Sequence, residues 1–418
     1  MSSADREFDI VLYGATGFSG KLTAGYLARA GAAARIALAG RSRERLLAVR
    51  DTLGAGARNW PLVIADVSEP STLEAMAART RVVATAVGPY TRYGLPVVAA
   101  CAKSGTDYAD LTAEVMFVRA SIDLYHKQAV DTGARIVHSC GFDSMPSDLN
   151  VYQLYRRAAE DGAGELGDTT FVMRSFFQGG GSGGTLASVF EMMRTASSDP
   201  EARRLVNDPY TLTTDRGAEP DAGPRRQFAS RRGRNVAPEL AGYWVGGFMW
   251  APHNARIVRR SNALQGWAYG RRFRYSEAMS LGKSFVAPVA AAAVTGATAT
   301  VWGLGNRYFR RLPRRLLERV APKPGSGPGE GIRRRGHYRV ETYTTTTTGG
   351  RYLATFAQDD DAYNGTAVLL GESCLALALD RDQLSGLRGV LTPAAAMGDA
   401  LLARLPAAGV SMGTTRLD

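Results

Sequence analysis

Short apolar runs alternate with amphipathic segments along the first third of the chain. Apolar runs bounded by glycine or polar residues are typical of buried strands, and the segments between them have helical spacing. The expected strands are 8–13, 35–40, 61–66 and 81–89, followed by 106–111 and 134–141, and the expected helices are 18–30, 44–54, 72–79 and 95–103. This alternation predicts an α/β fold with a Rossmann-type, doubly wound parallel sheet over residues 1–145.

The pattern changes after Asp143. Alternating apolar and polar positions then predict strands, and the pair Gly349-Gly350 predicts the turn of an antiparallel hairpin. The expected elements are a strand at 169–178, a helix at 186–196, loops over 197–236, a hairpin of 337–348 with 351–358, and a helix that starts at Thr392-Pro393. We therefore predict a second α+β domain over 146–386, built on a mixed sheet.

Residues 284–306 contain no charged side chain and are flanked by Lys283 and Arg307. Their length meets the ~20-residue requirement for a membrane span. Most of the side chains are Ala, Thr and Gly, and Pro288 lies inside, so insertion would be only weakly favourable. The pattern leaves three alternatives open: a membrane span, a segment that contacts lipid, and a buried helix.

Composition supports a folded protein of more than one domain, with 418 residues, 45% of them hydrophobic and 22% charged. The three cysteines Cys101, Cys140 and Cys374 are widely spaced, which argues against disulfides and structural zinc, so we expect no metal site. The N-terminal residues lack the pattern of a signal peptide. We expect a cytoplasmic location, with association at the inner face of the plasma membrane as an alternative.

The net charge of +12 is concentrated in the second half of the chain. Residues 256–335 hold 17 Lys and Arg against 3 Asp and Glu. This excess fits a solvated basic face, and it equally fits attraction to a phosphate-bearing substrate, an acidic carrier protein or an anionic membrane. No nucleic-acid-binding motif accompanies the arginines, so we expect no nucleic-acid partner.

The first expected strand runs directly into a glycine turn, Gly14-Ala-Thr-Gly17-Phe-Ser-Gly20, that opens a helix. Glycines at this spacing permit a tight turn and a close approach of the backbone to a pyrophosphate, and the helix N-terminus attracts that anion. The segment predicts a dinucleotide site. Its expected binding residues in this turn are Gly14, Thr16, Gly17, Phe18 and Gly20.

The end of the second expected strand indicates which nicotinamide cofactor is used. NAD sites place a carboxylate there, whereas this chain has Arg41-Ser42 and no carboxylate before Glu44. A guanidinium would pair with a 2′-phosphate, so NADPH is the predicted cofactor. Asp66 is expected at the adenine edge, and Gly88 and Pro89 are expected beside the nicotinamide.

Several motifs carry a family resemblance: GATGFSG (14–20), GRS (40–42), VGPY (87–90), DYADLT (107–112), CGFDSMPSDL (140–149), SGGT (182–185), IVRRSNAL (257–264) and LTPAAAMGDALL (391–402). The chain resembles the saccharopine dehydrogenase-like family, in its mycobacterial trans-acting enoyl reductase subfamily. The resemblance implies NADPH-dependent reduction of an enoyl group on a polyketide or acyl chain held by a synthase or carrier protein. It implies a role in envelope lipids of phthiocerol dimycocerosate or phenolic glycolipid type. It also implies that a C-terminal helix, 387–418, returns to pack on the first domain.

Enoyl reduction needs a donor to the thioester carbonyl and a proton for the α-carbon. Tyr90 and Tyr93 are the candidate donors, and aromatic packing is their alternative role. Weaker candidates are Tyr108, Asp110, His253, Ser182 and the glycine loop 179–184. Two other functions stay open: a non-catalytic NADPH-binding lipid or membrane protein, and a saccharopine dehydrogenase-like oxidoreductase with another substrate.

Overall fold

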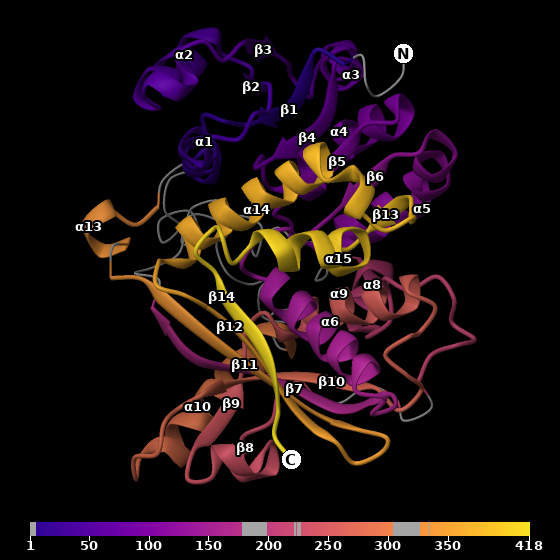
Figure 1. Cartoon of the computed structure of the whole chain (residues 1–418), viewed down its shortest axis with the longest axis vertical. Coiled ribbons are helices and arrows are strands. Elements are labelled where there is room, and N and C mark those ends of the chain that lie inside the picture. Colours follow the sequence, from indigo (N-terminus) through magenta and orange to yellow (C-terminus); the bar gives the residue numbers. More distant parts are fainter. Residues whose placement is uncertain (1–5, 178–198, 221–222, 224–226, 304–326, 334) are drawn as a thin grey trace.

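The computed structural model describes residues 6–177, 199–220, 223, 227–303, 327–333 and 335–418 (Figure 1). It contains a parallel seven-stranded sheet in the order β13-β6-β5-β4-β1-β2-β3. The strands are β1 (Phe8–Tyr13), β2 (Ile36–Gly40), β3 (Leu62–Ile64), β4 (Thr80–Thr85), β5 (Asp107–Asp110), β6 (Arg135–Val137) and β13 (Gly389–Leu391). The doubly wound α/β prediction is confirmed, and the strand order reverses at β1, between β2 and β4.

Helices cover both faces of this sheet. They are α1 (Phe18–Ala30), α2 (Arg43–Thr52), α3 (Pro70–Ala78), α4 (Tyr90–Ser104), α5 (Val115–Thr132), α14 (Ala362–Leu379) and α15 (Pro393–Arg404), with short 3-10 turns at η2 (Ala55–Ala57) and η6 (Arg381–Gln383). Along β1, Ile10 and Leu12 join the core on the α14 side, while Val11 and Tyr13 join the core on the α3 and α4 side. A strand buried on both faces explains why this segment is apolar throughout.

The second sheet is mixed, in the order β14-β12-β11-β7-β10-β9-β8. Its strands are β7 (Leu166–Phe177), β8 (Arg231–Arg232), β9 (Trp244–Gly247), β10 (Arg274–Ser280), β11 (His337–Thr346), β12 (Arg351–Gln358) and β14 (Ser411–Arg416). The β7–β10 pair is parallel and the other pairs are antiparallel. The predicted hairpin is confirmed as β11–β12. The predicted helix at 186–196 lies outside the described residues.

The remaining helices belong mainly to the layer of the second sheet. They are α6 (Met145–Glu160), α8 (Pro200–Asn207), α9 (Ala251–Leu264), α10 (Ala287–Gly303) and α13 (Glu330–Arg333), with 3-10 turns at η3 (Gly233–Asn235) and η4 (Pro238–Leu240). Helix α6 packs on β7, β11 and β12, and α15 packs on α6. In Figure 1, α14 and α15 therefore cross the middle of the molecule, between the two sheets.

The C-terminal region differs from the prediction of one helix over 387–418. Residues Gly389–Leu391 form β13, which pairs with β6, and only Pro393–Arg404 are helical. The positive φ of Gly409, +87°, then turns the chain, and β14 pairs with β12 at the edge of the second sheet. Helix α14, which precedes residue 387, also packs on α1, β1, β4 and β5. After β6 the chain therefore returns to the first sheet twice, once as the covering helix α14 and once as the edge strand β13.

The charge-free segment contains α10, which is neither buried nor fully exposed. Ala287 and Ala291 are buried toward β9, whereas the opposite side of the helix is open. Among the described helices only α14 has the length and hydropathy of a membrane span, and 83% of its apolar window is buried. That degree of burial is typical of a core helix.

Three arginines of the basic region are internal. Arg256, Arg259 and Arg260 on α9 are buried, and their guanidinium groups donate to main-chain carbonyls of residues 206–212 and of Val390. Burial lowers the pKa of Arg256 to about 10 and that of Arg260 to about 9. This part of the predicted basic face instead ties the 206–212 segment to α9.

A buried carboxyl group joins α6 to the start of α15. Asp148 accepts a hydrogen bond from the Ala394 N–H at 2.8 Å and another from the Ser261 hydroxyl. Burial raises the pKa of Asp148 to about 7. The folded protein therefore holds this proton over a pH range in which the unfolded chain has released it.

We expect pH to change the stability of the wild type relative to the variant Asp148→Asn. Because the folded pKa lies above the unfolded value, the relative stability of the wild type is highest below about pH 4. It is lost as pH rises through about 7. The loss should be on the order of a few kcal/mol. Urea unfolding of both proteins from pH 4 to 8 measures the difference, and a constant difference would contradict the prediction.

Candidate functional site

The turn between β1 and α1 requires glycine at two of its three glycine positions. Gly14 has φ +83°, and a Cβ there would lie 2.4 Å from the Val87 Cγ2 atom. A Cβ on Gly20 would lie 2.2 Å from the carbonyl oxygen of Gly14. Both distances are far below van der Waals contact. The main chain of the turn can therefore pack this closely only without side chains.

The N-terminus of α1 provides the anion-binding surface. Gly17 is the N-cap residue and supplies no side-chain cap, and the first turn carries no acidic residue. The uncapped amides and the positive end of the helix dipole fit a diphosphate group. Thr16 and Phe18 flank this turn and are partly exposed. The residues present therefore fit the diphosphate of a dinucleotide.

Arg41 follows β2, where the ribose of a dinucleotide is recognised in this fold. Its side chain is 73% exposed, and its Nε atom lies 4.0 Å from Asp66 Oδ2. Asp66 follows β3 and accepts hydrogen bonds from the Ser68 N–H and hydroxyl, which lower its pKa. Ser42 caps α2 by accepting from the Arg45 N–H at 3.3 Å. The structure thus places Arg41 and Asp66 together, with the guanidinium reaching into solvent.

The segment after β4 was predicted as strand up to residue 89, but β4 ends at Thr85 and α4 begins at Tyr90. The Gly88–Pro89 peptide bond is cis. Glu114 is buried and accepts hydrogen bonds from the Tyr90 N–H at 2.9 Å and the Thr91 N–H at 2.8 Å. This carboxylate caps α4 from a distant part of the chain, so a local pattern could not reveal the helix start.

The two candidate tyrosines have different surroundings. Tyr90 is buried, its hydroxyl donates to the Thr85 carbonyl at 3.1 Å, and it accepts from the Leu111 N–H at 3.2 Å. Its ring stacks on Phe117 with centroids 5.6 Å apart. A hydroxyl with both internal partners is not placed to donate to a substrate, which corrects the prediction for Tyr90. Tyr93 is half-buried and keeps its hydroxyl without a hydrogen bond to any described residue.

The weaker candidates Tyr108 and Asp110 belong to a buried network at the ends of β5 and β6. Asp110 accepts from the Tyr108 hydroxyl at 2.9 Å and lies 2.7 Å from Nδ1 of His138. The His138 Nε2 atom lies 2.9 Å from the Ser121 hydroxyl. All four side chains are buried. The network therefore holds β5, β6 and α5 together inside the protein.

His253 is also buried and structural. Its Nε2 atom lies 3.1 Å from the hydroxyl of Ser139, whose φ of +65° places it in the left-handed region. Burial lowers the pKa of His253 to about 3, so the imidazole stays neutral at physiological pH. The loop 179–184 and Ser182 lie outside the described residues. Within the described ranges, no group of His, Cys, Asp and Glu side chains could hold a metal ion, and the three cysteines are free and buried.

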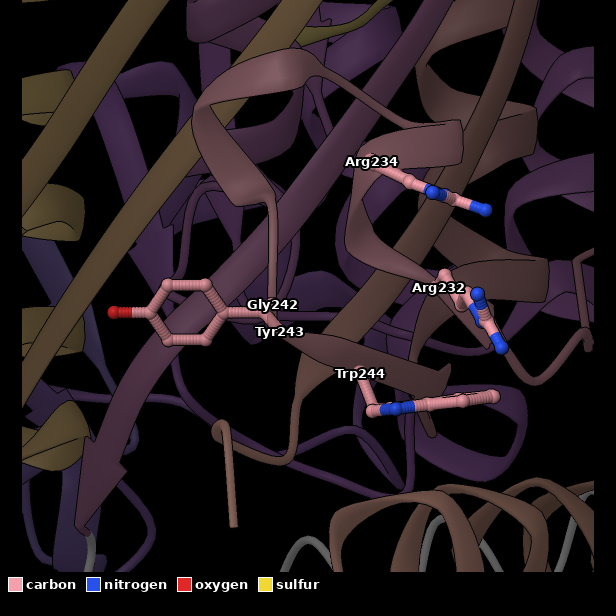
Figure 2. Close-up of a pocket in the computed structure, with 5 residues that line it drawn as sticks. All are labelled: Arg232, Arg234, Gly242, Tyr243 and Trp244. Carbon is pink, nitrogen blue, oxygen red and sulfur yellow. The ribbon is translucent and has the colours of Figure 1, made fainter. Parts of the chain in front are cut away.

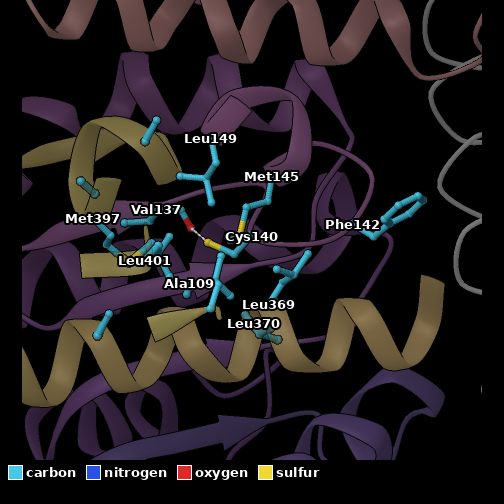
Figure 3. Packing of buried hydrophobic residues seen from close by; sticks show 14 of the residues in the cluster. Ala109, Val137, Cys140, Phe142, Met145, Leu149, Leu369, Leu370, Met397 and Leu401 are labelled. Carbon is cyan, nitrogen blue, oxygen red and sulfur yellow. Dashed lines mark hydrogen bonds between the residues drawn. The ribbon is translucent and has the colours of Figure 1, made fainter. Parts of the chain in front are cut away.

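The loop between β6 and α6 lies where the two sheets meet. The Phe142 N–H donates to Thr366 of α14 at 3.2 Å, and its ring stacks on Phe176 of β7. Figure 3 shows Cys140 and Met145 among the other residues of the buried apolar cluster and Phe142 at its margin, and all three belong to this cluster. The loop is thus anchored to both sheets at the carboxyl edge of the parallel strands, where ligands of such folds bind.

Asp143 lies in this loop, and the sequence reasoning missed its potential role. It is partly exposed and makes no hydrogen bond with the described residues. Desolvation of the carboxyl group by the surrounding protein raises the pKa of Asp143 to about 6. A carboxylic acid with a pKa near neutrality suits proton transfer. The sequence did offer one signal for Asp143: it comes just after the expected strand 134–141, where the alternation of strands and helices ends.

Comparison with known proteins adds to this geometry. The model of the saccharopine dehydrogenase NADP binding domain matches residues 10–137, which extend from β1 to β6. A trans-acting enoyl reductase of Mycobacterium tuberculosis is 73% identical over 417 residues, with 100% of both chains covered. A protein of the same name from Mycobacterium ulcerans is 72% identical over the same length and coverage.

A solved structure shares the architecture. Apo saccharopine dehydrogenase (L-Glu forming) from Saccharomyces cerevisiae matches with a TM-score of 0.53, covering 98% of this chain and 100% of that chain. The sequence identity is 12%, so this likeness concerns the fold alone.

Two glycines of α1 provide a matched test of the turn. Gly20→Ala should lower dinucleotide affinity at least about 100-fold, because its Cβ would collide with the Gly14 carbonyl and displace the amides. Gly25→Ala in the same helix meets only the flexible end of Arg29, at 3.3 Å, and should preserve binding. Calorimetric titration with NADPH, with thermal unfolding as a check on folding, compares them. Equal affinities would contradict the assignment of the turn.

Proposed function

The chain belongs to the family of the mycobacterial trans-acting enoyl reductases and carries an NADP-binding domain of the saccharopine dehydrogenase family, and from this premise we propose that it reduces an enoyl thioester with NADPH. It is an NAD(P)-dependent oxidoreductase. The proposed substrate is a polyketide or acyl chain held on a separate synthase or carrier protein. The proposed pathway is the assembly of envelope lipids of phthiocerol dimycocerosate or phenolic glycolipid type.

The main support is full-length similarity combined with the glycine turn. The relatives named trans-acting enoyl reductases align over all of both chains, so the similarity includes both sheets. The uncapped amides of α1 fit the diphosphate, and Arg41 supports NADPH over NADH because its guanidinium suits a 2′-phosphate. When bound at this turn, the cofactor would supply the hydride that the β-carbon receives.

The chain's own residues would bind, orient and protonate the substrate. The Tyr93 hydroxyl is the remaining tyrosine candidate for a hydrogen bond to the thioester carbonyl, which would stabilise charge that develops on that oxygen. Asp143, in the loop where the two sheets meet, is the candidate that delivers a proton to the α-carbon. Phe142, the preceding residue, stacks on Phe176 of β7, which anchors the loop that carries this carboxyl group.

The proposal is tested by turnover with carrier-bound and coenzyme A enoyl thioesters of several chain lengths. We expect NADPH oxidation to depend on the enoyl substrate and to be much slower with NADH. Arg41→Gln should weaken NADPH binding about tenfold with little effect on NADH, since the lost contact involves only the 2′-phosphate.

Two results would contradict this function. Tight NADPH binding without turnover of any enoyl thioester would favour the non-catalytic alternative, and turnover of an amino-acid substrate would favour the other oxidoreductase. An unchanged NADPH affinity in Arg41→Gln would separately remove the argument for the 2′-phosphate.

Asp143→Asn tests the proton donor. Because the protonated acid is the active form, wild-type kcat should fall as pH rises through about 6. The variant should lose about 100-fold or more in kcat, lose this pH dependence and retain NADPH affinity. Asp131→Asn, at an exposed carboxylate paired with Lys127, is the control and should behave as wild type. A variant with the wild-type pH profile would exclude Asp143 as the donor.

A further inference from the structure

The outer edge of the second sheet carries a small basic and aromatic pocket (Figure 2). It has a volume of about 210 Å³ and is lined by Arg232, Arg234, Gly242, Tyr243 and Trp244. Figure 2 shows the side chains of both arginines and the tryptophan on one side, whereas Tyr243 points the opposite way. A pocket below the usual ~300–1,000 Å³ of organic ligand sites suits a small group such as a phosphate.

The cations at this edge are not neutralised. Within the described part of the chain, neither Arg232 nor Arg234 has an ion-pair partner, and both are exposed. The nearby carboxylate of Glu239 is already paired with Arg351. Lys283 is exposed, and its Nζ atom lies 4.5 Å from the centre of the Tyr243 ring. The edge thus presents a local excess of positive charge.

An apolar tip adjoins these cations. We define the α10 tip as Phe285, Val286 and Val289, whose exposed fractions are 94%, 49% and 72%. The main-chain N–H of Trp244 donates to the Gly282 carbonyl at 3.0 Å. This hydrogen bond joins the pocket to the segment that leads into the α10 tip.

The other side of α10 is fixed to the sheet. A Cβ on Gly246 would lie 2.8 Å from the Ala291 carbonyl oxygen, and a Cβ on Gly247 would lie 2.5 Å from Thr298 Oγ1. This close contact holds one side of the helix against β9. The apolar side chains of the α10 tip remain exposed.

We propose that the pocket and the α10 tip form a docking site for an anionic phospholipid bilayer. Arg232 and Arg234 contact headgroup phosphates, and Trp244, on the same side of the sheet edge, lies at the level of the headgroups, where tryptophan is favoured. The tip enters the boundary between headgroups and acyl chains. The site is distinct from the dinucleotide turn, and docking does not depend on turnover.

The shape of the surface favours a bilayer over an acidic carrier protein. Phe285 is almost fully exposed and protrudes, whereas a protein partner would require a complementary cavity for it. A fluid bilayer accommodates a protruding aromatic side chain without such a cavity. The adjacent uncompensated cations supply the attraction to anionic lipid that a short apolar tip alone lacks.

Co-sedimentation with vesicles tests the proposal on the full chain. The wild type should bind vesicles of equal phosphatidylcholine and phosphatidylglycerol, and bind phosphatidylcholine vesicles much less. Arg232→Gln/Arg234→Gln should weaken binding about 25-fold, which is about fivefold for each cation near the surface. Phe285→Ser/Val289→Ser should weaken binding to both compositions, because it removes the inserted part.

Matched controls separate the site from general charge and hydrophobicity. Lys103→Gln/Lys127→Gln removes the same charge from the layer of the first sheet, and Leu124→Ser removes an apolar side chain that is 60% exposed on α5. Both should bind vesicles as the wild type does, and NADPH affinity should be unchanged in every variant.

Three results would overturn the proposal. The first is equal binding of the wild type to both vesicle compositions, and the second is unchanged binding of the tip variant. The third is arginine-dependent binding of an acidic carrier protein, or of inorganic phosphate, by a chain that does not sediment with vesicles.

Discussion

The absence of a side chain at Gly20 determines how the first half of the molecule is arranged. With only a hydrogen at this position, the first turn of α1 packs against the Gly14 carbonyl, after the short turn that follows β1. The same contact leaves the first amides of α1 uncapped at the edge of the sheet. Gly14 and Gly20 therefore allow the close packing that the turn requires, and the same packing leaves amides available for an anion.

This arrangement extends through α14 to the second sheet. A Cβ on Gly371 of α14 would lie 2.4 Å from Tyr26 of α1, so these two helices are in close contact. Phe18, at the start of α1, meets Tyr363 edge-on with centroids 5.1 Å apart. Since α14 directly follows β12 along the chain, it connects the first turn of α1 to the second sheet.

Local patterns predicted those parts of the fold that depend on neighbours in sequence. Strands β1 to β6, the glycine turn and the β11–β12 hairpin have short-range signals, and the structure contains them. The edge strand β13 and the helix α5 were not predicted. The Glu114 cap of α4 and the placement of Asp143 depend on contacts between distant segments, which no spacing rule reveals. The prediction for the C-terminal residues was wrong for a related reason. Strand β14 pairs with the edge of β12, which is a contact between distant segments, and its own sequence pattern is weak.

A count of arginines in the sequence does not show which of them are buried and which are exposed. Arg256 and Arg260 of α9 are inside the protein, where they satisfy carbonyls of an irregular segment that has few strand or helix partners. Arg232 and Arg234 lie outside, on a sheet edge without carboxylate partners among the described residues. A guanidinium group can perform both tasks because it offers several donors and keeps its charge even when burial lowers its pKa. The formal charge of +12 therefore counts two kinds of arginine, those that stabilise the interior and those that the fold presents to solvent.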